Sequence, residues 1–218
     1  MTKEEVHRRI LEVGIVPVVR APSADLAVLA AEAVWAGGIP IVEITMTVPG
    51  AVEAIAQLTR SIGREVLIGA GTVLDPDSAR RCLNAGAEFL VSPGFDPETV
   101  KLAISEGRLM MAGALTPTEV IAAFRAGSDF VKIFPCGNVG GPGYIKALKA
   151  ALPQIPMVPT GGVNLATAAD FLRAGASALG VGGELVSREA LQARDSGAIA
   201  DRARQYAAIV RQVREGGN

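Results

Sequence analysis

One lysine of this chain stands alone in an apolar run. Residues 129–135 read DFVKIFP, with Lys132 at the centre, and the whole sequence has five lysines against sixteen arginines. An ammonium among apolar side chains is poorly solvated, and an uncharged amine is a nucleophile toward carbonyl carbons. The structural alternative is a lysine at a sheet edge whose ammonium reaches water. We interpret Lys132 as a candidate for imine chemistry, provided that the fold encloses it.

A single glutamate stands in a second apolar run. Residues 41–47 read IVEITMT, and Glu43 is their only charge. Imine formation, carbinolamine dehydration and C–C cleavage each move a proton, and a carboxylate in apolar surroundings can serve as both acid and base. The alternative is a buried Glu–Lys ion pair without chemistry, and such pairs add little stability. We predict that Glu43 transfers protons for Lys132.

Two polar residues end predicted strands and are candidates for binding a carboxylate. Arg20 ends the run 15–20, and Thr72 lies in the turn GAGTV at 69–73. A guanidinium binds a carboxylate through two parallel hydrogen bonds, although a solvated strand-end arginine is the alternative. As a dinucleotide fingerprint the GAGTV turn fails, because the third glycine is missing. We therefore expect the Thr72 hydroxyl and the Arg20 guanidinium to face a substrate.

Two glycine-bearing turns follow the last two predicted strands. They read TGGVN at 160–164 and GVGG at 180–183. Amides exposed by such glycines can bind a phosphate, and barrels often hold one in the loops after strands seven and eight. The alternative for each turn is a glycine that only permits a tight bend. The glycines predicted to bind phosphate are Gly161, Gly162, Gly182 and Gly183.

These residues require a scaffold that brings strand ends together, and the chain alternates between short apolar runs and Ala/Leu-rich stretches of helical period. Strands are predicted near 15–20, 41–46, 66–70, 88–92, 108–112, 129–134, 156–160 and 177–181. Helices are predicted at 24–36, 50–61, 76–84, 97–105, 117–125, 142–150 and 165–174, with a helical N-terminus and a closing helix at 195–213. The order favours an α/β fold, a (β/α)8 TIM barrel in one domain over 1–218, with a doubly wound open sheet as the alternative. In such a barrel strands two and six face each other, so Glu43 and Lys132 meet at its mouth.

A faint repeat supports the barrel. An Ala-Gly pair closes the predicted helix before each even-numbered strand, at 36–38, 85–87, 126–128 and 174–176. Glycine at these positions is expected to supply a left-handed C-terminal cap. Recurrence at every second βα unit is typical of a barrel built from two-unit quarters.

The composition excludes several classes of function. A net charge of −1 and scattered arginines argue against a nucleic acid or an anionic membrane as partner. The polar N-terminus and the lack of a long apolar stretch predict a cytoplasmic protein without a membrane span. Cys82 and Cys136 have no C-x-x-C spacing, and His7 is the only histidine, so a Ser-His-Asp triad and a His-based zinc site are not expected. We predict no metal and no cofactor.

Five segments, in order along nearly the whole chain, resemble the 2-keto-3-deoxy-6-phosphogluconate (KDPG) / 4-hydroxy-2-oxoglutarate (KHG) aldolase family. They are EIT at 43–45, GAGTV at 69–73, SPG at 92–94, VKIFP at 131–135 and PTGGV at 159–163. The resemblance implies a homotrimeric class I aldolase without a metal, which releases pyruvate from a 2-keto-3-deoxy sugar acid.

The resemblance also implies roles for individual residues. Lys132 matches the Schiff-base lysine, Glu43 the general acid and base, and Thr72 a contact to the pyruvyl carboxylate. Phe134, Pro93 and Thr160 match residues of the substrate pocket, and the glycine turns match the phosphate site.

Two positions depart from the family pattern. Many members carry an arginine four residues after the glutamate, where this chain has Thr47, so we assign the carboxylate to Arg20, with Thr47 beside the substrate. A serine commonly follows the second glycine turn, where this chain has Glu184.

The expected reaction is cleavage of KDPG to pyruvate and glyceraldehyde 3-phosphate, a small-molecule reaction. Alternatives are an aldolase for KHG or for the 6-phosphogalactonate epimer (KDPGal) and, in another class, a non-catalytic barrel that serves as a scaffold or assembly protein.

Overall fold

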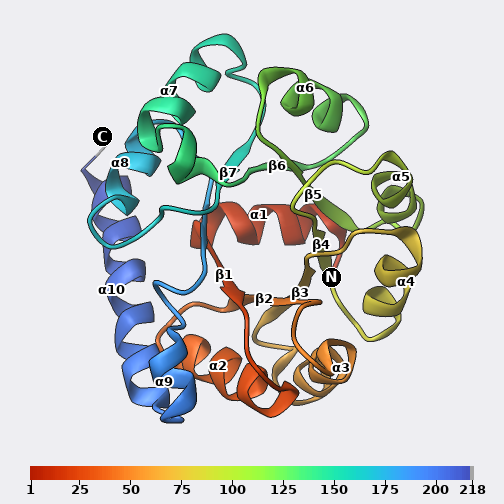
Figure 1. Ribbon diagram of the computed structural model, residues 1–218, viewed down its shortest axis with the longest axis vertical. Coiled ribbons are helices and arrows are strands. Elements are labelled where there is room, and N and C mark those ends of the chain that lie inside the picture. The colour runs from red at the N-terminus through yellow and green to blue at the C-terminus, as the bar shows by residue number, and fades with distance from the viewer. Residues whose placement is uncertain (217–218) are drawn as a thin grey trace.

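Eight parallel strands close into a barrel (Figure 1), in a computed structural model that describes residues 1–216. The strands are β1 (Ile15–Val19), β2 (Ile41–Thr45), β3 (Leu67–Gly71), β4 (Phe89–Val91), β5 (Leu109–Ala114), β6 (Phe130–Ile133), β7 (Met157–Pro159) and β8 (Leu179–Val181). They pair in the order β7-β6-β5-β4-β3-β2-β1-β8, and a parallel bridge between Thr160 and Gly180 joins the two ends. This closure confirms the predicted (β/α)8 barrel and shows that the open doubly wound sheet is wrong.

Helices connect the strands and cover the outside of the barrel (Figure 1). They are α1 (Lys3–Val13), α2 (Ala24–Ala36), α3 (Ala51–Ile62), α4 (Pro76–Asn84), α5 (Pro97–Ser105), α6 (Pro117–Arg125), the 3-10 turn η1 (Cys136–Val139), α7 (Pro142–Ala151), α8 (Ala168–Arg173), α9 (Arg188–Gln192) and α10 (Ser196–Glu215). Three of them start with an N-cap side chain and then a proline, at Asp75, Asp96 and Thr116. The first amide groups of a helix have no intrahelical partner, so proline, which has no amide hydrogen, is well tolerated there. These three helices therefore start where the sequence predicts. None of the helices within residues 1–216 is both long and apolar enough to cross a membrane.

The structure differs from the predicted elements in two respects. The predicted helix at 165–174 starts only at Ala168, because Asn164 Oδ1 accepts hydrogen bonds from the amides of Ala166 (2.9 Å) and Thr167 (3.0 Å) and holds a turn there. The sequence pattern also predicts neither η1 nor α9. At 4 and 5 residues, these elements are too short to show a hydrophobic period.

The Ala-Gly repeat has the predicted left-handed conformation, but its first copy is shifted by one residue. There Gly37 is the C-cap of α2 with a φ of −81°, and Gly38 takes the left-handed conformation instead. Gly38, Gly86, Gly127 and Gly175 have φ angles of 89°, 102°, 99° and 99°. Each of these glycines follows the C-cap of its helix and turns the chain toward an even-numbered strand.

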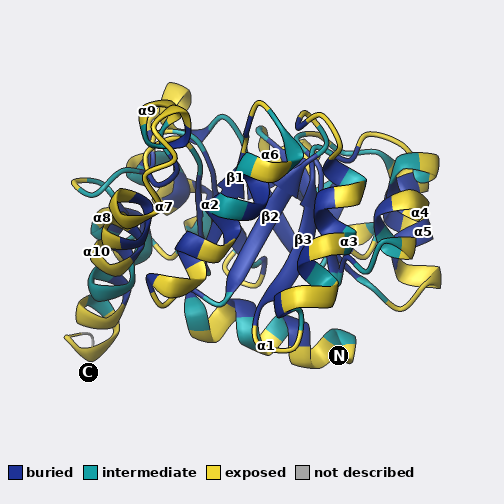
Figure 2. Cartoon of the chain, turned by 90° about the horizontal axis from the view of Figure 1, so that it is seen from below, coloured by how far each residue is buried: buried dark blue, intermediate teal, exposed yellow. Residues whose placement is uncertain are grey.

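Helix α1 closes the amino-terminal end of the barrel (Figures 1 and 2). Its Val6 and Ile10 pack into the inner cluster of strand side chains, and His7 stacks on Phe130 with 4.6 Å between ring centroids. Lys3 pairs at 2.9 Å with Asp129, the residue before β6. The single histidine therefore lies at the end opposite to the carboxyl ends of the strands.

Candidate active site

Strand alternation directs the two charged strand residues into the barrel. In β6, Phe130 belongs to the inner cluster, whereas Val131 packs in the outer core between the sheet and the helices. Successive strand residues point to opposite faces, so Lys132 points inward. The same alternation in β2 directs Glu43 inward. Two strands that lie far apart in the sequence thus supply one acid and one amine to the same interior.

The structure brings Glu43 and Lys132 together. Lys132 Nζ lies 4.0 Å from Glu43 Oε1, and each side chain is only 2% exposed. This separation is longer than a hydrogen bond, so the contact is an ion pair without a direct proton bridge. Lys132 Nζ also lies 5.4 Å from the centre of the Phe134 ring, which is close enough for a cation–π contact. Phe134 thus forms part of the wall around the amine.

The surroundings of the Glu43 carboxyl group favour its protonated form. Burial raises the pKa of Glu43, and the positive charges of Lys132 and Arg20 oppose that rise without cancelling it. Glu43 Oε1 is buried and has no hydrogen-bond partner among the described residues. A carboxyl group with a raised pKa and an open acceptor can both donate and accept a proton near the neighbouring amine.

Strand β3 makes room for the Glu43 carboxyl group by means of a glycine. A Cβ atom added at Gly71 would lie 1.8 Å from Glu43 Oε1 and 2.4 Å from its carboxyl carbon. The residue after it, Thr72, has a φ of 56°, a left-handed backbone conformation that residues other than glycine rarely adopt. Such strain is concentrated at functional sites. The GAGTV turn is thus shaped around Glu43.

A buried serine fixes the loop that carries Pro93. Ser92 Oγ donates a hydrogen bond to the Gly94 carbonyl (2.6 Å) and accepts one from the Gly113 amide (3.3 Å). A Cβ atom at Gly113 would lie 2.1 Å from the Pro93 carbonyl carbon, so β5 approaches this loop closely. Pro93 is therefore held in place at the carboxyl end of β4.

A chain of two hydroxyl groups links β1 to Thr47. The buried Thr45 hydroxyl donates to the Val19 carbonyl (3.1 Å) and lies 2.7 Å from the Thr47 hydroxyl. Thr47 thus lies beside the end of β1, from which Arg20 extends.

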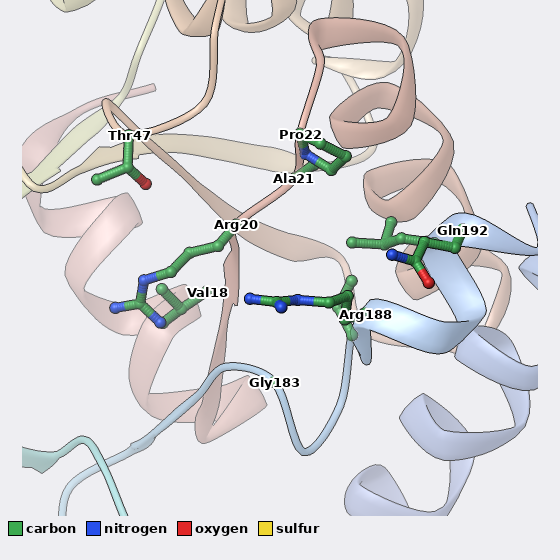
Figure 3. Close-up of a pocket in the computed structure, with 10 residues that line it drawn as sticks. Val18, Arg20, Ala21, Pro22, Thr47, Gly183, Arg188 and Gln192 are labelled. Atoms are coloured by element: carbon green, nitrogen blue, oxygen red, sulfur yellow. The ribbon is translucent and has the colours of Figure 1, made fainter.

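A cavity of about 600 Å³ opens beside Arg20 (Figure 3). It is lined by Val18, Arg20, Ala21, Pro22, Thr47, Gly183, Val186, Arg188, Leu191 and Gln192. Neither Glu43 nor Lys132 lines this cavity. Arg20 connects the cavity to the pair, because its charge opposes the burial-driven rise in the pKa of Glu43. Its guanidinium Nη1 also lies 3.0 Å from the position of a Cβ atom on Gly182.

The sequence does not predict the contribution of α9 to this cavity. Arg188 and Gln192, the first and last residues of α9, both line it. The available signal is Ser187, an N-cap whose side chain accepts a hydrogen bond from the Ala190 amide. A serine before a five-residue stretch is a weak signal on its own.

The two glycine turns lie near each other at the β7–β8 junction. Gly161 and Gly162 have φ angles of 85° and 77°, and a Cβ atom on Gly162 would lie 2.7 Å from Gly137 Cα in η1. A Cβ atom on Gly180 would lie 2.0 Å from the Thr160 hydroxyl. Thr160 and the first glycine turn are therefore packed tightly between η1 and β8.

Glu184 does not line the cavity. This exposed carboxylate acts on α10 instead, where burial, with a smaller contribution from Glu184, raises the pKa of Tyr206 to about 12. The second glycine turn thus contributes Gly183 to the cavity without a carboxylate.

Comparisons with known proteins identify a family and several relatives of this chain. The model of the family described as KDPG and KHG aldolase matches residues 6–201. The KHG/KDPG aldolase of Escherichia coli (strain K12) is 35% identical over 199 residues, which cover 90% of this chain and 92% of that protein. The 2-dehydro-3-deoxy-6-phosphogalactonate aldolase of the same strain is 33% identical over 202 residues, or 92% and 95% of the two chains. The KDPG aldolase of Legionella pneumophila, solved with pyruvate captured at low pH as a covalent carbinolamine, has a TM-score of 0.84 at 29% identity and covers 91% of this chain and 96% of its own.

Proposed function

Because the chain belongs to the KDPG and KHG aldolase family, we propose that it cleaves KDPG to pyruvate and glyceraldehyde 3-phosphate through an imine on Lys132. The observation that carries this proposal is the Glu43–Lys132 pair, at 4.0 Å and 2% exposure, inside the barrel. A scaffold without activity has no need of such a pair, since a buried ion pair adds little stability.

The proposed reaction begins at the substrate ketone. The uncharged amine of Lys132 attacks the C2 carbonyl carbon, and the carbonyl oxygen takes up a proton to give a carbinolamine. Glu43 donates a proton to the carbinolamine hydroxyl group, which leaves as water and yields the protonated imine. At 4.0 Å from Lys132 Nζ, Glu43 Oε1 is within reach of a hydroxyl group on the carbon that becomes bonded to that nitrogen.

Cleavage then uses the same carboxyl group as a base. Glu43 accepts the proton of the C4 hydroxyl group while the C3–C4 bond breaks, and the electron pair moves into the protonated imine to give an enamine. Protonation of the enamine carbon and hydrolysis by water release pyruvate and restore the amine. No metal is required in this proposal, because the protonated imine is the electron sink.

The remaining predicted residues bind and orient the substrate in this scheme. Arg20 and Thr72 hold the carboxylate, so the ketone is presented at a fixed distance from the amine. Thr47, Thr160, Pro93 and Phe134 line the substrate, and the glycine turns at 161–162 and 182–183 face its phosphate end.

A substrate panel tests the proposed function. We expect the highest kcat/KM on KDPG, lower values on KDPGal and KHG, and pyruvate as a product of each. Relatives named as KHG/KDPG and KDPGal aldolases support all three as candidates. A coupled assay for pyruvate measures the rates, and the absence of pyruvate from every substrate would contradict the proposal. Equal rates with and without a phosphate would argue against the glycine turns as a phosphate site.

Replacing Gly71 with alanine is expected to lower kcat on KDPG by about 10-fold to 100-fold, since displacing a reacting group by roughly one ångström has effects of this size. The new methyl group occupies the place of the Glu43 carboxyl group, which must move. Steady-state kinetics and circular dichroism measure activity and folding. Gly143→Ala is the matched control, because its added Cβ meets no atom within 4 Å. An unchanged kcat in Gly71→Ala would show that the position of Glu43 is unimportant.

The homotrimer stays a prediction that rests on the resemblance, and the cytoplasmic location stays a prediction from the sequence alone. Sedimentation equilibrium of the purified chain measures the number of subunits directly.

A further inference from the structure

The cavity lined by Arg20 carries two positive charges and no negative one. Arg20 extends into it from the end of β1, and Arg188 extends from α9 toward Arg20 (Figure 3). Its other lining residues are apolar or uncharged, and Glu184, the nearest acidic residue after β8 in sequence, lies outside the lining. Two like charges in one concave space repel each other and attract an anion.

Neither guanidinium has an acidic partner in the described part of the chain. Arg108, Arg173 and Arg204 each pair with a carboxylate, as is common for surface arginines. Arg20 and Arg188 form no such pair within residues 1–216. Their shared charge is therefore available to a bound molecule.

The position of Arg188 separates its role from that of Arg20. Arg20 lies next to Gly182 and influences Glu43, so it is near the reacting end of a substrate. Arg188 lies on α9, the element that follows β8, and Gln192 lies one helical turn away on the same cavity wall. A guanidinium and an amide on one wall match the oxygens of a terminal phosphate monoester.

We propose that Arg188 is a specificity-determining residue that binds the terminal phosphate of the substrate, with Gln192 as a second donor, while Arg20 holds the carboxylate. This inference rests on the proposed function and deepens it. The phosphate then lies between α9 and Gly183, and the chain selects phosphorylated over unphosphorylated 2-keto-3-deoxy acids by means of one side chain outside the barrel strands.

The test is Arg188→Gln, measured on KDPG and on unphosphorylated 2-keto-3-deoxygluconate. Loss of a charge-assisted hydrogen bond is expected to raise KM for KDPG by about 10-fold to 100-fold, with kcat nearly unchanged. The kinetics on the unphosphorylated acid should stay the same within about twofold, because that substrate does not reach Arg188. The matched control is Arg173→Gln, which replaces an exposed arginine on α8 and should leave the kinetics on both substrates unchanged.

Two further measurements separate this inference from the proposed function. Borohydride trapping of pyruvate on Lys132 tests the imine, and Arg188→Gln should trap as well as the unaltered chain. Binding of inorganic phosphate, measured by calorimetry, tests the site without turnover and should weaken in Arg188→Gln. If trapping fails but phosphate binding depends on Arg188, the proposed function is wrong and the anion site stands. If trapping succeeds but Arg188→Gln lowers kcat/KM equally on both substrates, the proposed role of Arg188 is wrong and the aldolase function is retained. The same conclusion follows if the substitution changes neither the kinetics on KDPG nor the binding of phosphate.

Discussion

Lys132→Met is expected to lower the cleavage of KDPG by at least about 10,000-fold, because loss of a covalent nucleophile leaves only binding and orientation. Among the residues that the structure describes, Lys132 is the one lysine located in a strand, so no other amine replaces it at the same place. Methionine fills a similar volume, and the barrel should therefore stay folded.

The measurement has a chemical and a structural part. After borohydride treatment with pyruvate, mass spectrometry should locate the reduced adduct on Lys132 in the unaltered chain and find none in Lys132→Met. Lys146→Met, which removes an exposed lysine from α7, should retain both activity and adduct. An adduct on another lysine, or turnover within about tenfold in Lys132→Met, would refute the imine mechanism.

Removal of the lysine also tests the energetics of the pair. Lys132 opposes the rise in the pKa of Glu43, so its loss should favour the protonated, neutral carboxyl group. The double substitution Glu43→Gln with Lys132→Met removes both charges. Its free energy of unfolding should equal or exceed that of the unaltered chain, since uncharged replacements of buried ion pairs are often neutral or stabilising.

Glu43→Gln is expected to lower kcat on KDPG by about 100-fold to 10,000-fold, the usual contribution of a general acid or base. Glutamine keeps the shape and can still accept a hydrogen bond, but it cannot transfer a proton. In the unaltered chain kcat/KM should fall as the pH rises through the raised pKa of Glu43, above the ordinary glutamate value of 4.5, because the first proton transfer needs the protonated carboxyl group. Glu43→Gln should lack this fall, and a pH–rate profile with the same fall in both proteins would assign it to another group.

The raised pKa of Glu43 also makes a statement about stability. The folded chain binds the Glu43 proton more tightly than the unfolded chain does, so unfolding releases protons between the two pKa values. The resulting stabilisation is fully present below about pH 4.5 and is lost as the pH rises through the raised pKa. The melting temperature of Glu43→Gln should therefore rise relative to that of the unaltered chain as the pH increases. Glu53→Gln, at an exposed position on α3, should show no such trend.

Local signals predict most of the scaffold. The Asp-Pro and Thr-Pro starts and the left-handed glycines after helices are decided within a few residues, and for that reason the bounds of α4, α5 and α6 match the predictions. The meeting of Glu43 and Lys132 follows from strand period and barrel order, which are also readable in the sequence.

The cavity is not predictable in the same way. Arg188 lines it because the chain turns after β8 into a short helix that borders the same cavity as Arg20, and this arrangement depends on contacts between distant residues. An exposed arginine after a serine has the same local sequence as many solvated arginines, so its direction is decided by tertiary structure alone. The absence of Glu184 from the cavity lining has the same origin.

The closure of the barrel is uneven, and this has a kinetic consequence. Five residue pairs align β2 with β3, whereas β7 and β8 meet through the Thr160–Gly180 bridge. The least expensive local unfolding of a closed sheet starts where its ladder is shortest. That seam ends in the two glycine turns, so we expect transient opening of the backbone to be concentrated beside the proposed phosphate site. A bound ligand that contacts both turns would then slow this opening and hold β7 and β8 together.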